Sequence, residues 1–203
     1  MKKIQRNFYS KDTLLIAKNL LGKILVHEVN GKKISGRIVE TEAYKGIKDK
    51  AAHSYGNRRT KRTEIMYGCC GFSYVYMIYG MYYCFNIVTE DIDIPEAVLV
   101  RALEPLQCLD EMSINRYKKE FTCLSKIEVK NLTNGPGKLC QALLIDKNQN
   151  KKDLCSSNLY VEDDDFKDFN IKNSKRVGIN YAGDAANYPW RFYIEDNSYV
   201  SVK

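Results

Sequence analysis

The sequence predicts one α+β domain with a largely antiparallel sheet, and three observations point to this class. With 203 residues and 44% hydrophobic content, the chain is long enough to bury one core. Stretches of alternating apolar and polar residues follow one another with short turns between them, as in antiparallel hairpins. A few helical stretches lie among them, and no repeat, linker or low-complexity segment divides the chain. Residues 1–203 are therefore expected to form a single domain.

The first part of the chain predicts a helix, a hairpin and a loop. "SKDTLLIAKNLLG" (10–22) has the spacing of a capped helix, with Gly22 as its terminator. "KILVHEV" and "KKISGRIVETEAY" predict two strands joined at Asn30-Gly31, a favoured two-residue hairpin turn. A polar and basic loop follows, up to about Thr63.

The middle of the chain predicts a second hairpin and then a strand that leads into a helix. "FSYVYMIYGMYYCFNIV" (72–88) is expected to turn near Tyr79-Gly80. "AVLVRALEP" predicts a strand, and Pro105 is expected in the first turn of a helix over 105–118.

The last part predicts one more helix and further strands. "GPGKLCQALLI" predicts a loop that opens a helix around Lys138. The tail contains "LYVEDD", "KRVGINYA" and "RFYIEDNSYVSV", and we expect it to be mostly strand with a turn at Asp196-Asn197.

Positive charge is concentrated in one segment. The net charge is +7, and residues 31–62 contain ten Lys/Arg against Glu40, Glu42 and Asp49, a surplus of ten minus three, or seven. This concentration favours a face that binds a polyanion, although a solvated basic loop would have the same composition.

Cysteine usage and missing motifs narrow the class of protein. The seven cysteines form no C-x-x-C pair, which predicts reduced, mostly buried thiols of a cytosolic protein. There is no run of about 18 apolar residues, and the basic start lacks the apolar stretch of a secretion signal. We therefore expect a cytoplasmic protein, nucleoid-associated if bacterial, without membrane contact. Because phosphate-loop, dinucleotide and zinc-deaminase motifs are missing, neither metal nor cofactor is expected.

One strand ends in two carboxylates next to an aromatic ring. In "GRIVETEAYKG" (36–46), alternation places Glu40, Glu42 and Tyr44 on one face. A carboxylate there can activate a water molecule or stabilise a developing cation. Alternation alone does not choose between Glu40 and Glu42.

The tyrosine-rich hairpin supplies candidate contacts for a nucleic-acid base. Tyr74 and Tyr76 share one face of the first arm, and Tyr82 and Asn86 share a face of the second. Tyrosine is a good strand former, so a structural hairpin explains most of these residues. Tyr79, at the turn, has no core to enter and is suited to insertion between stacked bases.

Isolated polar residues allow both a structural and a functional interpretation. Asn86 lies in an apolar arm, where it either bonds to the backbone or contacts the edge of a base. Arg101 lies in an apolar strand, where it either pairs with Glu40 or Glu104 or orients a reacting carboxylate or water. His53 lies in the basic loop, whose possible phosphate donors are Arg58, Arg59, Thr60, Lys61 and Arg62.

Several motifs, in order along the chain, resemble one family. They are "GRIVETEAYKG", "AAHSYGNRRTKRTEIMY", "YVYMIYGMYYCFNIV", "VRALEPL" and "GPGKLCQAL", followed by "RVGINYAGD" and "WRFYI". Together they resemble the alkyladenine (3-methyladenine) DNA glycosylases of the methylpurine type, from about residue 12 to the C-terminus. The resemblance implies a curved antiparallel sheet with surrounding helices, and base excision without metal or cofactor.

The resemblance also implies roles for single residues. Glu42 matches the catalytic general base, and Arg101 and the backbone around Val177 match groups that help to hold the catalytic water. Asn86 matches the residue that excludes guanine by a clash with its 2-amino group. The positions that match the walls around a flipped base are Tyr44, His53 and Tyr76.

The same resemblance places DNA contacts on several elements. Tyr79 matches the residue that intercalates into the gap left by the flipped base. Tyr55 departs from the family pattern, because a basic residue is usual after the His-Ser pair. With Arg62 of the basic loop, the other expected DNA contacts are Arg58, Thr60, Met66, Met81, Tyr82 and Lys138.

The expected function is therefore base-excision repair. The chain would act as a monomer, flip alkylated or deaminated purines such as 3-methyladenine and hypoxanthine out of double-stranded DNA, and hydrolyse the N-glycosidic bond with a water activated by Glu42. A cationic alkylated purine leaves without being protonated, so one carboxylate suffices. The alternatives are a non-catalytic single-stranded nucleic-acid-binding module, which leaves Glu42 unexplained, and a lysine-dependent lyase.

Overall fold

Strand β3 (Lys32–Tyr44) is the central element of the fold, and its two halves have different neighbours. The structure is a computed structural model that describes residues 1–202. The first half of β3 pairs with β2 (Ile24–Val29) across the predicted turn, where Asn30 and Gly31 both have positive φ. The second half pairs with β9 (Arg191–Ile194), which takes over the same side of β3 beyond the end of β2. β6 (Glu96–Gln107) pairs along the other side of β3.

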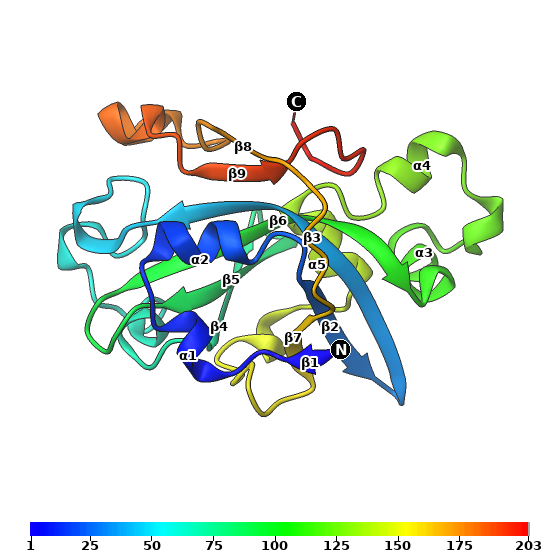
Figure 1. Cartoon of the computed structure of the whole chain (residues 1–203), viewed down its shortest axis with the longest axis horizontal. Coiled ribbons are helices and arrows are strands. Elements are labelled where there is room, and N and C mark those ends of the chain that lie inside the picture. Colours follow the sequence, from blue (N-terminus) through cyan, green and yellow to red (C-terminus); the bar gives the residue numbers. More distant parts are fainter. Residues whose placement is uncertain (203) are drawn as a thin grey trace.

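The sheet confirms the predicted α+β class with largely antiparallel strands. Its order is β1–β7–β2–β3–β6–β5–β4, with β8 joined through β9, and every named pairing is antiparallel. The register between β3 and β6 shifts on both sides of Glu40, and Figure 1 shows β3 as a long, curved strand. The remaining strands are β1 (Lys2–Lys3), β4 (Ser73–Ile78), β5 (Tyr82–Thr89), β7 (Leu159–Asp163) and β8 (Ile171–Ser174).

Short helices pack against the sheet. The α-helices are α1 (Arg6–Tyr9), α2 (Thr13–Asn19), α3 (Leu109–Tyr117), α4 (Lys126–Lys130) and α5 (Pro136–Ala142). The 3₁₀ segments are η1 (Gly46–Lys48), η2 (Tyr55–Asn57), η3 (Glu64–Tyr67), η4 (Phe121–Cys123), η5 (Lys147–Gln149) and η6 (Asn180–Asn187). Within residues 1–202, none of these helices has the length and apolarity that a membrane crossing requires.

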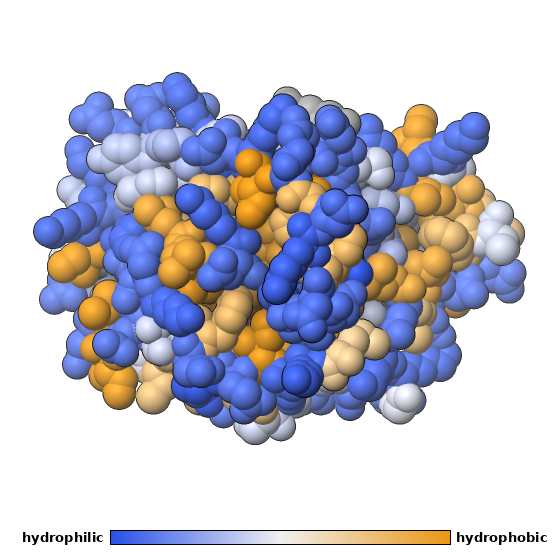
Figure 2. Space-filling model, in the orientation of Figure 1, coloured by the Kyte–Doolittle hydropathy of each residue, from blue (hydrophilic) through white to orange (hydrophobic). Residues whose placement is uncertain are grey.

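Helix α2 defines which face of β3 is available for a site. The Thr41 hydroxyl donates to the carbonyl of Ala17 in α2 at 2.8 Å. Because side chains alternate along a strand, Glu40 and Glu42 point to the face away from α2. The main core is fully buried and includes Ile16, Leu20, Leu25, Ile38, Phe85, Ile87, Leu103 and Leu139. On the outside, Figure 2 shows a mostly hydrophilic face with hydrophobic side chains scattered over it.

Two element boundaries differ from the sequence expectations for helices. The first helix is shorter than predicted: Asp12 caps it by accepting from the amides of Leu14 and Leu15, and it ends at Asn19, before Gly22. The expectation that Pro105 lies in a helical turn is wrong, because β6 continues to Gln107 and the helix starts at Leu109. The N–H and the carbonyl of Leu103 point away from β3 and hydrogen-bond to Thr133. Pro105 lies two residues further along the strand, so its nitrogen points to the same side. Its missing N–H therefore costs no sheet hydrogen bond.

The tail contains less strand than predicted. "KRVGINYA" is not a strand: Gly178 adopts a positive φ of 75°, and a 3₁₀ segment begins at Asn180. After β9 the chain turns at Asp196 as expected, but no second strand follows in the described residues. The thiols are all free, yet only Cys70, Cys84 and Cys140 are buried, so the expectation of mostly buried cysteines is also wrong.

Candidate active site

A pocket of about 330 Å³ opens where β3, β4, β5 and β6 meet the segments 51–66 and 177–181. This volume is in the range of small-molecule sites. The sheet supplies its floor, and the two irregular segments supply its walls. Nine of the residues expected at the site line this pocket: Tyr44, His53, Arg62, Met66, Tyr76, Tyr79, Asn86, Arg101 and Val177.

Glu42 lies immediately behind the pocket wall and has no exposed surface. Its Oε1 accepts from the amide of Val177 at 2.7 Å and lies 3.4 Å from a guanidinium nitrogen of Arg101. Its Oε2 accepts from the Tyr44 hydroxyl at 2.8 Å. A carboxylate has about four acceptor positions, so these three partners leave about one, on Oε2. The three residues that bind Glu42 all line the pocket.

Arg101 joins Glu42 to Glu40. Its Nε donates to Glu40 Oε1 at 3.1 Å, a closer contact than the one it makes with Glu42. The structural interpretation of Arg101, a buried ion pair with Glu40, is confirmed, and the same guanidinium also approaches Glu42. The alternative pairing with Glu104 is wrong, since that carboxylate accepts from Asn197 instead.

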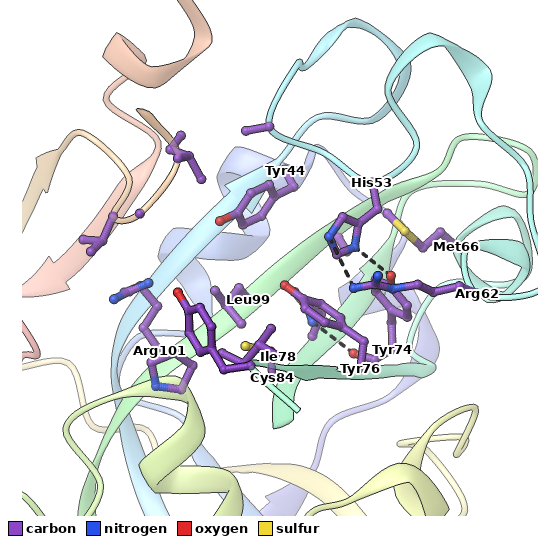
Figure 3. Close-up of a pocket in the computed structure, with 18 of the residues that line it drawn as sticks. Tyr44, His53, Arg62, Met66, Tyr74, Tyr76, Ile78, Cys84, Leu99 and Arg101 are labelled. Carbon is purple, nitrogen blue, oxygen red and sulfur yellow. Dashed lines mark hydrogen bonds between the residues drawn. The ribbon is translucent and has the colours of Figure 1, made fainter. Parts of the chain in front are cut away.

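Aromatic rings face each other across the pocket. Tyr44 lies on one side, and His53 and Tyr76 lie on the other (Figure 3). The His53 and Tyr76 rings pack edge to face, with centroids 4.6 Å apart. Burial, and secondarily the charge of Glu42, raises the pKa of Tyr44 well above its usual value, and burial also raises that of Tyr76. Both phenols are therefore neutral at pH 7.

His53 is neutral as well. Burial, followed by the charges of Arg62 and Arg58, lowers the pKa of His53 to about 4. Its Nε2 faces a guanidinium nitrogen of Arg62 at 3.5 Å, and its Nδ1 lies 2.8 Å from the Tyr74 hydroxyl. Because Arg62 can only donate, the neutral ring accepts at Nε2 and donates from Nδ1 to Tyr74. The pocket thus presents uncharged rings on both sides.

Asn86 and Met66 lie deep in the pocket. Asn86 is buried and donates from Nδ2 to the carbonyl of Tyr74 at 3.0 Å, directly across the hairpin. Its amide oxygen has no partner among residues 1–202 and is available at the pocket surface. Met66, expected at a DNA contact, is only 2% exposed and lines the pocket.

The tip of the β4–β5 hairpin projects away from the body of the protein. Tyr79 is 87% exposed and has a positive φ of 51°, a conformation that bulky residues rarely adopt. Met81 and Tyr82 beside it are also exposed, at 68% and 41%. Large apolar side chains exposed next to a pocket indicate a surface that contacts a partner.

The basic segment separates into paired and unpaired charges. Five of its side chains form ion pairs with acids elsewhere in the chain: Lys32, Lys33, Arg37, Lys45 and Arg59. The others form no ion pair within residues 1–202, and they are Lys48, Lys50, Arg58, Lys61 and Arg62. Three of these, Lys50, Arg58 and Arg62, line a second hollow of about 310 Å³ next to the pocket, together with Thr60.

Lys138, at the start of α5, uses only part of its hydrogen-bonding capacity within the protein. Its ammonium group donates to the side-chain oxygens of Asn131 and Asn134 at 2.7 and 2.8 Å. An ammonium group has three donors, so one remains for a further acceptor.

The sequence interpretation missed a buried ion pair that joins the two pocket walls. Arg176 contacts both carboxylate oxygens of Asp49, at 2.5 and 2.8 Å, and neither side chain is exposed. Its guanidinium also lies 4.7 Å from the centre of the Tyr44 ring. Asp49 precedes His53 in one wall and Arg176 precedes Val177 in the other. Only the charge of these residues inside otherwise irregular segments could have indicated the pair.

Two further findings bear on the class of protein. Residues 1–202 contain no group of three His, Cys, Asp or Glu side chains arranged to hold a metal ion. The family model for methylpurine-DNA glycosylase (MPG) matches residues 7–198. The chain belongs to the methylpurine-DNA glycosylase family. As a member it is a DNA N-glycosylase, a DNA-repair hydrolase whose substrate is damaged DNA, and not a non-catalytic binding module.

Curated relatives cover the whole chain. One from Desulfitobacterium hafniense (strain Y51) is 58% identical over 203 residues, with all of both chains aligned. One from Clostridium acetobutylicum is 56% identical, with 98% of each chain aligned, and one from Clostridium novyi (strain NT) is 57% identical over both full chains. Each bears the name "Putative 3-methyladenine DNA glycosylase".

The Asp49–Arg176 pair yields a stability prediction. Asp49→Asn leaves a buried guanidinium without its counter-charge, and we expect the free energy of unfolding to fall by roughly 3–5 kcal/mol. Urea unfolding followed by circular dichroism measures the change. Asp168→Asn, at an exposed aspartate, is the matched control and should change stability little. Equal stability of the two variants would contradict the role of this pair.

Proposed function

We propose that this glycosylase excises alkylated and deaminated purines, of the 3-methyladenine and hypoxanthine types, from double-stranded DNA, as a monomer that flips the lesion into the pocket. The observation that carries the proposal is the set of contacts around Glu42, which leaves about one acceptor position on a carboxylate whose three partners all line the cavity. In this proposal a water molecule occupies that position.

The reaction in this proposal is the addition of water to the sugar. Glu42 takes a proton from the water, whose oxygen bonds to C1′ as the bond between C1′ and the purine nitrogen breaks. The electron pair of that bond goes to the purine, which neutralises the positive charge of an alkylated base. The negative charge of Glu42 also stabilises the oxocarbenium character that develops on the sugar. Arg101 and the Val177 amide keep the carboxylate in place.

Selection of the base follows from the neutral rings. A cationic purine would lie between Tyr44 on one side and His53 and Tyr76 on the other. The electron-rich faces of these rings attract a cationic base more strongly than a neutral, normal base. Because His53 and both phenols carry no charge at pH 7, the rings do not repel a cationic base.

Flipping requires that pairing and stacking be lost, at a cost of a few kcal/mol. Insertion of the Tyr79 ring into the duplex offsets part of this cost. The exposed tip also brings Met81 and Tyr82 against neighbouring bases. The unpaired cations Arg58 and Arg62, with Thr60 and Lys138, are the donors that we assign to the DNA backbone.

Glu42→Gln tests the proposed base. The variant keeps the shape of the side chain but cannot accept a proton, so we expect the single-turnover rate of base release to fall by at least about 10²-fold while lesion binding persists. The measurement is base release from duplexes that carry 3-methyladenine, 7-methylguanine, hypoxanthine or no lesion. Release at the wild-type rate would show that Glu42 is not the base.

Tyr79→Ser tests the wedge. Loss of one aromatic stacking contact worth about 1–3 kcal/mol should weaken binding of lesion duplex about 5- to 150-fold. Tyr79→Phe retains the ring and is the matched control, which should bind like the wild type. Fluorescence anisotropy on lesion duplex gives both affinities. If the serine variant binds lesion duplex as tightly as the wild type, Tyr79 does not act as a wedge.

Asn86→Gly tests the exclusion of guanine. Hypoxanthine is guanine without the 2-amino group, so the variant should release more normal guanine while its release of hypoxanthine changes little. The measurement is the ratio of guanine release from unmodified duplex to hypoxanthine release, compared between the variant and the wild type. An unchanged ratio would remove the exclusion role.

A further inference from the structure

Glu40 is a second buried carboxylate two residues before Glu42, with no exposed surface of its own. Four donors surround it. Oε1 accepts from Arg101 Nε at 3.1 Å, from Arg191 Nε at 2.6 Å and from the Ser201 hydroxyl at 2.9 Å. Oε2 accepts from the Ser201 amide at 2.7 Å. Such complete satisfaction fixes Glu40 rigidly.

We propose that Glu40, held by Arg191 and by Ser201 near the end of the chain, is a positioning residue that keeps Arg101 from saturating Glu42. The inference rests on the proposed role of Glu42 as the base. Glu40 does not touch substrate; it acts through Arg101.

The guanidinium group of Arg101 is divided between two carboxylates. Guanidinium groups favour bidentate binding of a carboxylate. Here Nε is bound to Glu40, and only one terminal nitrogen approaches Glu42, at the longer distance of 3.4 Å. Without Glu40, the fork is free to turn onto Glu42 and occupy its remaining acceptor position, which is the one that the water requires.

Charge leads to the same conclusion. Glu40 and Glu42 carry two negative charges, and Arg101 and Arg191 carry two positive charges, all with at most 7% exposure. Removal of one carboxylate charge leaves the cluster net positive, which favours the ionised form of Glu42 and makes it a weaker base.

The C-terminal residues complete this arrangement. Arg191 donates to the carbonyl of Val202 and, at 2.8 Å, to the hydroxyl of Ser174 in β8. Arg191 therefore ties the chain end to β9 and orients Ser201 toward Glu40. A segment about 160 residues away in sequence is thus part of the support of the catalytic strand.

Glu40→Gln tests the proposal directly. We expect the single-turnover rate of base release to fall about 10²-fold, as for a misplaced catalytic group, while the affinity for lesion duplex stays at the wild-type value. The acidic limb of the pH–rate profile should also move to lower pH, because the base is protonated only at lower pH once the Glu40 charge is gone. The groups facing Glu42 are Arg101 from β6, Cys84 from β5, Tyr181 from η6, Tyr44 and Glu40 from its own strand, and, through Glu40, Arg191 from β9.

Ser201→Ala is the second variant, because it removes the hydroxyl that donates to Glu40 and accepts from Arg101 Nη2 at 3.3 Å, and it keeps the charges of the cluster. We expect a smaller loss of rate with unchanged lesion affinity. The matched controls are Glu120→Gln and Ser198→Ala, both at exposed side chains without a hydrogen bond among residues 1–202, and both should react at the wild-type rate.

The possible results separate this inference from the proposed function. A wild-type rate and profile in Glu40→Gln, with Glu42→Gln inactive, would overturn the positioning role alone. A loss of rate with an unmoved pH profile and weaker lesion binding would also overturn it, since that pattern belongs to general destabilisation. Full activity of Glu42→Gln would overturn the proposed base itself. If Glu40→Gln does not fold, a wild-type rate in Ser201→Ala overturns the positioning role.

Discussion

The shared guanidinium of Arg101 is the interaction on which the rest of the site depends. Two carboxylates without exposed surface stand two residues apart on β3, and burying either charge alone would cost several kcal/mol. Arg101 and Arg191, from the two strands that flank this part of β3, compensate them. The cluster therefore requires that β3, β6 and β9 meet at one place, and the register shifts around Glu40 lie at that place.

A second buried pair makes the walls of the pocket as fixed as its floor. Strands hold Glu42, Tyr44 and Arg101 by their sheet hydrogen bonds, but His53 and Val177 lie on irregular segments. Asp49 and Arg176 connect these segments through a bidentate contact, and Arg176 also lies against the Tyr44 ring. Preorganisation of this kind matters because a displaced catalytic group can lose about 10²-fold in rate.

Local pattern predicted the fold well where local forces decide it. The Asn30-Gly31 turn, the tyrosine hairpin and the helix at Gly135-Pro136 all formed as expected. The failures occurred where distant contacts overrode local preference. Pro105 remains in a strand because its nitrogen faces no sheet partner, and the segment after Arg176, which is anchored to Asp49, turns at Gly178 and continues into a 3₁₀ segment.

The sequence by itself determined the chemistry: the strand with its carboxylates and tyrosine, the exposed aromatic tip, and a set of ordered motifs specific enough to indicate the family. Only the tertiary structure decided which carboxylate faces the pocket wall and which is enclosed, because alternation places Glu40 and Glu42 on the same face. It also decided which cations of the basic segment are paired and which stay unpaired, because the acidic partners of the paired ones lie up to about 130 residues away in sequence. Residue type and spacing are local properties, whereas burial and ion pairing depend on contacts between segments that only folding brings together.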